Sequence, residues 1–247
     1  MTDVEQIHVD DEDFPLRLDH NKPQIIFACG KKGSGKSYFN GLIYRSWPGD
    51  KLAIDVNGHA YVGPDAEKLK LEDGMPTRWP ERAPAMGEKK KPRNLHYVAN
   101  PRSATYRDDL YRAVGLALFP MDHPVLLWAG EVGELTPHSQ AGPHMRQLLQ
   151  QNRHHKTTAL FDAPRPIGVD PLVLAQANLV AVYRTPNPAD RKRIADSIGV
   201  APKRFDQVCL DTWRQGDHWF VLYHADQDRL YQCPPLPSDG DESTAAA

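Results

Sequence analysis

Eight residues from Gly30 to Ser37, GKKGSGKS, have the types and spacing that hold a triphosphate. They fit the pattern G-x-x-x-x-G-K-[ST] at every fixed position. Glycines let successive backbone N–H groups turn onto phosphate oxygens, where a Cβ would collide. Lys36 can reach the outer phosphates, and Ser37 can offer its hydroxyl to Mg²⁺. We therefore predict an ATP and Mg²⁺ site at this loop, whose other contributors are Lys31, Lys32, Gly33, Ser34, Gly35 and Tyr38.

The segments on either side of this loop satisfy the context that the motif needs. An apolar stretch, Gln24–Cys29, precedes it, and the pattern over Ser37–Trp47 predicts an amphipathic helix. The N-terminus of such a helix adds a positive dipole end beside the phosphates. The alternative interpretation is a glycine-rich turn that fits the motif by chance.

An acid at the end of a neighbouring strand is the second requirement for hydrolysis. In HPVLLWAGEVGEL, His123 to Leu135, an apolar run leads to Gly130 and Glu131. We predict that Glu131 is the general base and a metal ligand. An aspartate serving the metal would stand at Gly130. Two alternatives stay open: Glu131 merely ends a buried strand, or the site binds nucleotide and turns it over slowly.

Asp55 is a second strand-end acid, at the end of the segment KLAID. Its position is compatible with facing the nucleotide cleft. Strand-end carboxylates also cap backbone N–H groups, so both interpretations are kept.

The elements that must position these residues alternate along the chain. Six runs of apolar and β-branched residues predict buried strands, and four amphipathic patterns predict helices. Strands are expected at Gln24–Cys29, Lys51–Val56, Leu95–Ala99, Val125–Ala129, Thr157–Phe161 and Leu179–Tyr183, and helices at Ser37–Trp47, Ala104–Leu118, Met145–His154 and Ala189–Ile198. This alternation predicts an α/β fold, mainly a parallel sheet flanked by helices.

One domain is expected over residues 21–233. An acidic segment, residues 1–20, precedes it, and a disordered tail, residues 234–247, follows. The irregular, proline-rich stretch at about 63–93 predicts a surface insertion. His218–Cys233 predicts a C-terminal β-hairpin, because two alternating runs flank an Asp-Gln-Asp turn.

Composition limits the compartment and the partners. The 247 residues carry a formal net charge of -2, so any DNA contact must come from local patches or from a ring of subunits. Three cysteines without paired spacing and the lack of a long apolar run predict a cytoplasmic protein that makes no membrane contact. Trp213 and Trp219 can stack on bases or pack in the core.

The segment from Gln151 to Gly199 resembles the HerA/FtsK superfamily of ring-forming ATPases. The matching parts are Arg153 before the strand Thr157–Phe161, and the turn Pro164-Arg165-Pro166 followed by the short helix Leu172–Ala177. The strand Leu179–Arg184 and the run Asn187–Arg191 complete the pattern. The resemblance implies a RecA-like P-loop NTPase that forms a homo-oligomeric ring, with a hexamer as the expected assembly. It also implies an arginine acting on the neighbouring subunit's phosphates, for which Arg153 is the first candidate and Arg165 the second. Arg153 can equally complement a helix C-terminus.

The polar sensor of that superfamily falls on Pro164, and Asp162 is a nearby substitute. Three functions are compatible with these features. The first is an ATP-driven translocase of double-stranded DNA, in genome packaging with a capsid partner or in DNA transfer with a transfer complex. The second is a nucleotide-binding interaction subunit with weak or no ATPase activity. The third is a small P-loop kinase.

Overall fold

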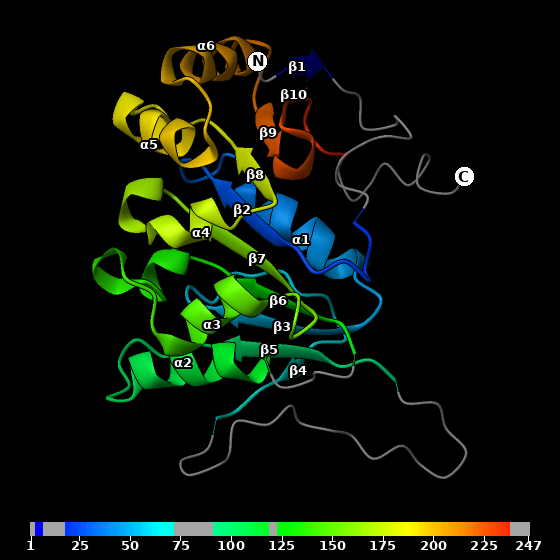
Figure 1. Ribbon diagram of the computed structural model, residues 1–247. Helices are drawn as coiled ribbons and strands as arrows, with labels where there is room; N and C mark the ends of the chain where they lie inside the picture. Colours follow the sequence, from blue (N-terminus) through cyan, green and yellow to red (C-terminus); the bar gives the residue numbers. More distant parts are fainter. Residues whose placement is uncertain (1–2, 7–17, 72–90, 119–122, 238–247) are drawn as a thin grey trace.

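The computed structural model describes residues 3–6, 18–71, 91–118 and 123–237. In this part of the chain ten strands form one sheet, in the order β1-β10-β9-β8-β2-β7-β6-β3-β5-β4 (Figure 1). The strands are β1 Asp3–Gln6, β2 Ile25–Cys29, β3 Asp50–Asp55, β4 Glu67–Lys68, β5 Asn94–Val98, β6 Val125–Ala129, β7 Thr157–Ala163, β8 Leu179–Val182, β9 Phe220–His224 and β10 Arg229–Cys233.

The strands from β8 to β4 run parallel, and β9 lies antiparallel between β8 and β10. Strands β2, β3, β6, β7 and β8 are buried at every position, which explains their nearly continuous apolar sequences. Strand β7 separates β2 from β6. The segments that follow these three strands therefore meet at one edge of the sheet.

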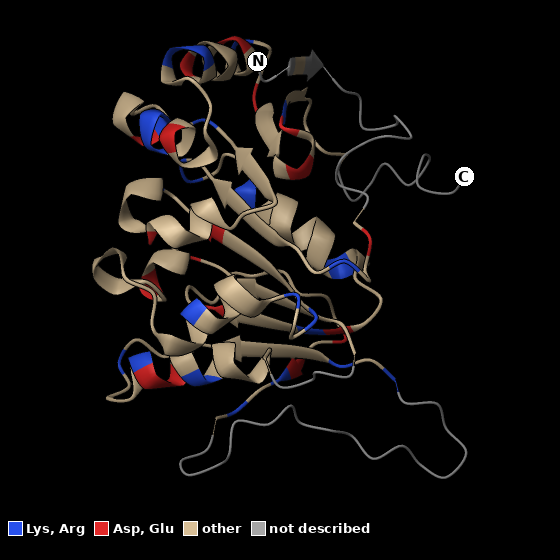
Figure 2. Ribbon diagram, in the orientation of Figure 1, with Lys and Arg blue, Asp and Glu red and all other residues tan. Residues whose placement is uncertain are grey.

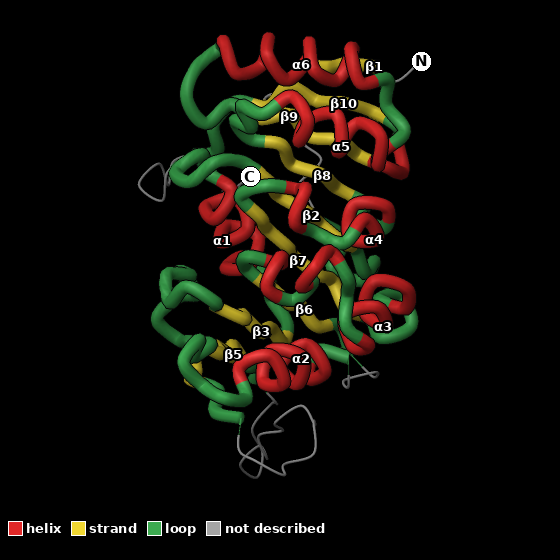
Figure 3. The backbone as a smooth tube through the Cα atoms, turned by 90° about the vertical axis from the view of Figure 1, so that its left-hand side faces the viewer, coloured by secondary structure: helices red, strands yellow, loops and turns green. Residues whose placement is uncertain are grey.

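Helices cover the two faces of the sheet unequally. They are α1 Lys36–Ser46, α2 Tyr106–Leu116, α3 Pro143–Gln151, α4 Pro171–Ala175, α5 Pro188–Ile198 and α6 Pro202–Arg214. Buried side chains of α2 to α6 belong to one hydrophobic cluster, and those of α1 belong to another. Figure 3 shows α1 on one side of the sheet and α3 and α4 on the other. In Figure 2 the charged residues lie mainly on helices and connecting segments.

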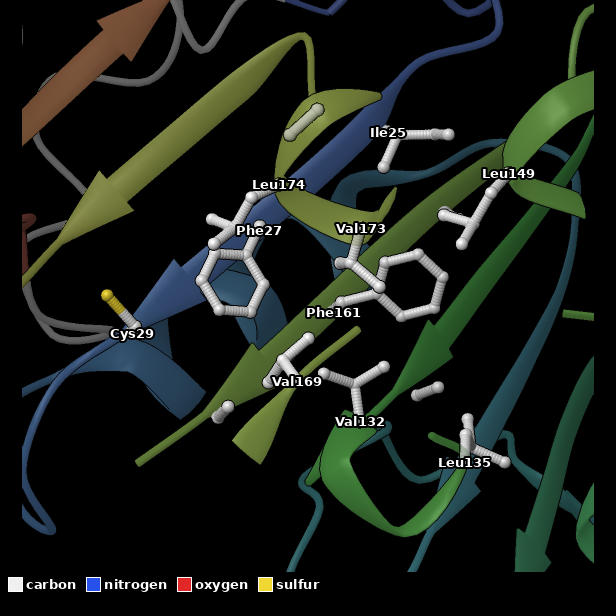
Figure 4. Packing of buried hydrophobic residues seen from close by; sticks show 14 of the residues in the cluster. Ile25, Phe27, Cys29, Val132, Leu135, Leu149, Phe161, Val169, Val173 and Leu174 are labelled. Atoms are coloured by element: carbon white, nitrogen blue, oxygen red, sulfur yellow. The ribbon is translucent and has the colours of Figure 1, made fainter. Parts of the chain in front are cut away.

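The larger hydrophobic cluster fixes the segments that carry the predicted acids. Figure 4 shows Val132, which begins the 3-10 turn after β6, and Leu135, which follows that turn, packed with Phe161 of β7 and Val173 of α4. All four side chains are buried. Glu131 directly precedes Val132 in the chain, and Asp162 directly follows Phe161, so the buried core sets the backbone positions of both acids.

The fold predicted from the sequence is confirmed. Each expected strand and helix exists, with ends that differ by at most three residues, as at α3, which ends at Gln151 rather than His154. The expected hairpin is β9 and β10. Helix α6 and strands β1 and β4 were not predicted. Strand β1 belongs to the segment expected as an acidic end, and it pairs in parallel with β10.

The predicted insertion at about 63–93 holds the two-residue strand β4, and its residues 72–90 lie outside the described part of the chain. Within the predicted tail, Pro234–Pro237 are described and Leu236 packs against the α1-side cluster. Residues 238–247 lie outside the described part. Among the described residues, none of the helices is both long and apolar enough to span a membrane.

Candidate nucleotide-binding site

The glycine-rich loop follows β2 and leads directly into α1, as predicted. Gly30, Gly33 and Gly35 all have positive φ, at 154°, 76° and 110°. A Cβ on Gly30 would lie 2.6 Å from both Ser34 Oγ and Tyr183 Cβ. Glycine is therefore required at position 30 by space as well as by backbone conformation.

The first turn of α1 offers N–H groups without a capping side chain. Its N-cap residue is Gly35, and its first turn contains no acidic residue. Four N–H groups at a helix N-terminus need partners from outside the helix. Together with the dipole, they form an anion site at the end of the loop.

Lys36 supplies an independent sign of an anionic ligand. Its side chain is buried, at 7 % exposure, and within the described residues its ammonium forms no hydrogen bond or ion pair. An ammonium on a mostly buried side chain that forms no direct ion pair leaves room for an anion beside it. Ser34 Oγ is also buried and lacks a hydrogen-bond partner among the described residues. These groups fit a bound triphosphate.

The other predicted loop residues surround this anion site. Lys31, Lys32, Gly33 and Ser37 are exposed. Tyr38 is half-buried, and its hydroxyl donates to the carbonyl oxygen of Pro237. The described start of the C-terminal tail therefore lies against the first turn of α1.

Glu131 lies at the same edge of the sheet as Ser37. The two residues line one polar hollow of about 70 Å³, together with Asp55, Asn57, Trp128, Gly130 and Asp162 among others. The structure thus brings together two residues that the sequence predicts for water activation and metal binding. Asn57 Nδ2 donates to Glu131 Oε1 across 3.4 Å.

The backbone and the environment of Glu131 are both unusual. It occupies the left-handed region, with φ 53° and ψ 55°, which is uncommon for a residue with a side chain. Burial raises the pKa of its carboxyl group, and the charge of Asp162 raises it further, whereas Lys36 lowers it. A raised pKa makes a carboxylate a better proton acceptor near neutral pH.

Asp55 has a structural role. Its carboxylate accepts backbone N–H groups from Asn57, Gly58, His59 and Ala60 at 2.8–3.2 Å, and it contacts His96 Nε2 at 3.2 Å. Burial would raise the pKa of Asp55, but the hydrogen bonds from His96 and from the backbone outweigh it and lower the pKa. The capping interpretation from the sequence therefore accounts for its contacts.

The two candidate arginines lie in different surroundings. Arg153 is exposed and precedes the start of β7, so it lies at the edge of the sheet opposite to the loop. It cannot reach the phosphates of its own subunit. Arg165 follows β7 and donates to the buried carboxylate of Asp190 at 2.9 Å.

Two pockets beside the loop contain residues that the sequence did not assign. One, of about 240 Å³, is mainly apolar and is lined by Gly35, Tyr38, Tyr183, His218, Pro235 and Leu236. The other, of about 250 Å³, is polar and includes Lys31, Lys32, Arg184, Trp213 and Trp219. Most of these side chains come from segments 150 or more residues away, so no local motif could have revealed them. Asn40 and Asn57 lie near Ser37 and Asp55 in the sequence, but they were missed because their contacts are with Asp162 and Glu131 at the ends of other strands.

The strand order and the loop define the RecA-like P-loop NTPase fold. The sequence matches no protein-family model, and a search of curated proteins finds no relative. The structure is similar to that of the genome-packaging NTPase of Sulfolobus turreted icosahedral virus 2. Its complex with AMPPCP has a TM-score of 0.64 at 16% identity, covering 87% of this chain and 99% of that chain.

The complex of the same viral NTPase with AMP has a TM-score of 0.63 at 16% identity, and the match covers 89% of this chain and all of that chain. The DNA-packaging ATPase of Sulfolobus Turreted Icosahedral Virus has a TM-score of 0.61 at 18% identity, and the match covers 88% of this chain and all of that chain. These similarities establish the fold. They confirm the P-loop NTPase architecture that the resemblance to the HerA/FtsK superfamily implied.

Proposed function

We propose that this protein is an ATPase that moves double-stranded DNA into a viral capsid. The observation that carries the proposal is the combination of one fold with one site. The fold matches packaging NTPases over their whole length. The site holds a buried, unpaired Lys36 at the loop and a strained Glu131 beside it.

The chemistry is hydrolysis of the terminal phosphoanhydride of ATP. The N–H groups of the loop and Lys36 bind the phosphate oxygens. Ser37 and Glu131, which line the same hollow, would hold Mg²⁺, which neutralises charge on the phosphates. Glu131 accepts a proton from the attacking water while the oxygen of that water forms a bond to the γ-phosphorus. The bond from that phosphorus to the bridging oxygen breaks, and ADP and phosphate leave.

The apolar pocket beside Tyr38 is the proposed site of the adenine ring. It adjoins Gly35, where the loop enters α1, so a ring placed there is connected to phosphates on the loop. Aromatic side chains of Tyr38 and Tyr183 offer flat faces for a base.

A ring of identical subunits is proposed because one candidate residue can act only between subunits. In a head-to-tail ring, two different surfaces of the same chain meet at each interface. Arg153 is exposed at the edge opposite to the loop, on a surface different from that of the loop, so it could meet the loop of a neighbouring subunit across such an interface. We propose a hexamer with DNA, bound non-specifically, in its centre, and a capsid protein as the partner that supplies the target.

A nucleotide-binding subunit with weak or no turnover is the second candidate function. One observation favours it: Gly130 stands where the metal-binding aspartate is expected. Under this alternative, replacing Glu131 by glutamine leaves the low ATP turnover unchanged.

The deciding experiment measures ATP turnover with and without duplex DNA, on protein whose assembly state is determined by light scattering. The proposal predicts an assembly larger than a dimer and turnover that rises with DNA. Lys36→Ala is the control, and it should lose both turnover and nucleotide affinity. Rings whose turnover ignores DNA would contradict the translocase. Full ATP affinity in Lys36→Ala would contradict the site itself.

A further inference from the structure

Gly130 and Asp162 are neighbours across two paired strands. Strands β6 and β7 are parallel, with Ala129 opposite Phe161, so the next residue on each is at the same level. A Cβ built on Gly130 would lie 3.7 Å from Asp162 Oδ2. The carboxylate of Asp162 therefore occupies the space beside the position that lacks an acid.

Asp162 is a buried carboxylate without a counter-charge. It is 3 % exposed, and among the described residues no Lys, Arg or His side chain is within ion-pair distance. Its hydrogen bonds are with neutral donors: Asn40 Nδ2 and Trp128 Nε1, each 3.1 Å from Oδ2, and the backbone N–H of Glu131, 3.4 Å from Oδ1. An unpaired buried charge is costly, so a cation is expected nearby.

The two oxygens of Asp162 differ in what they can still accept. Each carboxylate oxygen has about two acceptor positions. Oδ2 has two donors at good distance, whereas Oδ1 has one donor at a long distance. Oδ1 therefore keeps room for a further donor, such as a water molecule bound to a metal ion.

Asn40 provides a second, independent sign of a missing donor. It is 0 % exposed, and its amide nitrogen contacts Asp162, yet its Oδ1 has no hydrogen-bond partner among the described residues. An unsatisfied buried acceptor is uncommon and carries a cost. One acceptor without a donor, Asn40 Oδ1, thus lies beside a carboxylate oxygen, Asp162 Oδ1, that has room for a further donor.

We propose that Asp162, from the end of β7, takes over the metal-holding role that Gly130 leaves open on β6. Its carboxylate accepts hydrogen bonds from the waters of a Mg²⁺ ion held by Ser37 and the ATP phosphates. Ser37, Gly130 and Asp162 line the same polar hollow. This inference rests on the proposed nucleotide site. It explains how hydrolysis can proceed without an acid at Gly130.

The test compares ATP affinity in excess Mg²⁺ with ATP affinity in EDTA. In the unsubstituted protein Mg²⁺ should tighten binding. In Asp162→Asn this gain should fall about tenfold, with affinity in EDTA unchanged, because a charge-assisted hydrogen bond contributes on the order of 1.5 kcal/mol. Asn keeps the side-chain volume, so packing with Trp128 is preserved.

The matched control moves the acid back to the neighbouring strand. The φ of Gly130 is not positive, and an added Cβ finds ordinary contact distances, so the site accepts an aspartate. The double variant Gly130→Asp/Asp162→Asn should regain the Mg²⁺ gain. A purely structural role for Asp162 would leave the Mg²⁺ gain intact in Asp162→Asn, and that result overturns the proposal.

Failure of the nucleotide site itself gives a different pattern. The unsubstituted protein would then bind no ATP with or without Mg²⁺, which refutes both proposals together. If Asp162→Asn does not fold, a crystal structure of the unsubstituted protein with Mg²⁺ and a non-hydrolysable ATP analogue decides. A metal-bound water within hydrogen-bond distance of Asp162 supports the proposal, and a metal whose waters contact only Asp55 or Glu131 overturns it.

Discussion

Arg165 donates its Nε–H to Asp190 Oδ2 across 2.9 Å, and this pair joins the turn after β7 to the first turn of α5. Asp190 is 1 % exposed, whereas the Arg165 side chain is 54 % exposed. The arginine therefore neutralises a buried carboxylate of its own subunit. This contact competes with any role on a neighbouring subunit.

The first prediction is that Arg165→Ala destabilises the protein. It leaves Asp190 buried without its cation, which can cost 3–5 kcal/mol, but the exposure of Arg165 reduces the expected loss to about 1.5 kcal/mol. Urea unfolding without nucleotide measures the change. Arg153→Ala is the control, and its stability should match that of the unsubstituted protein. If Arg165→Ala keeps its stability but loses ATP turnover, then Arg165, rather than Arg153, is the arginine that acts on the neighbouring subunit's phosphates.

The second prediction concerns Glu131→Gln. Turnover should fall by about 10³, because general-base catalysis contributes on that order, while ATP affinity persists. Glu134→Gln, an exposed acid in the same short turn, is the matched control and should keep its turnover. Equal turnover in Glu131→Gln and the unsubstituted protein would favour the nucleotide-binding subunit over the ATPase.

The same variant makes a stability prediction whose sign follows from the raised pKa of Glu131. A carboxyl whose pKa is higher in the folded state opposes folding once it ionises. The unsubstituted protein should therefore match Glu131→Gln below the ordinary pKa of 4.5. Above the raised value it should be less stable, by about 0.5 kcal/mol, since Glu131 is half-exposed. Urea unfolding at pH 4 and pH 8 checks this difference.

Much of the site could be predicted because its residues lie next to strand ends. The loop from Gly30 to Ser37 is a local pattern, and Glu131 follows an apolar run directly. Asp162 was noted only as a neighbour of the sensor position, because its importance depends on the register of β6 and β7. That register is a long-range property, which no spacing along the chain contains.

Helix α6 and strand β1 show the same limit at the level of the fold. Helix α6 buries Phe205, Val208 and Cys209. The predicted helix ended at Ile198, and no element was assigned to residues 202–214, although Gly199 and Pro202 mark the break between two helices. Strand β1 has an acidic sequence, Asp-Val-Glu-Gln, and pairs at an edge, where partner strands rather than burial define it.

The third prediction compares two glycines of the loop. Gly30→Ala should destabilise the protein by about 3 kcal/mol, because its Cβ meets Ser34 and Tyr183 at 2.6 Å in addition to an unfavourable φ. Gly33→Ala shares the positive φ, but its Cβ meets nothing within 4 Å. Its expected loss is about 1 kcal/mol. Thermal unfolding without ATP measures both, and equal losses would mean that crowding at Gly30 is relieved by movement of the loop.

The fourth prediction tests Arg153 between subunits by mixing two inactive variants. Lys36→Ala subunits cannot bind nucleotide, and Arg153→Ala subunits lack the arginine proposed to act on the next site. In a mixed ring, an Arg153→Ala subunit can receive Arg153 from a Lys36→Ala neighbour. We expect each variant alone to be inactive and the mixture to recover a fraction of the unsubstituted turnover.

The control for this mixing experiment is Lys36→Ala combined with Glu131→Gln subunits. Both lesions then affect residues that act within their own subunit, so no arrangement of neighbours assembles a complete site and turnover should stay absent. Full activity of Arg153→Ala on its own would remove Arg153 from the mechanism. If the Lys36→Ala and Arg153→Ala mixture stays inactive in rings shown to exchange subunits, Arg153 is needed within its own chain. The position of Arg153 at the opposite edge of the sheet argues against that result.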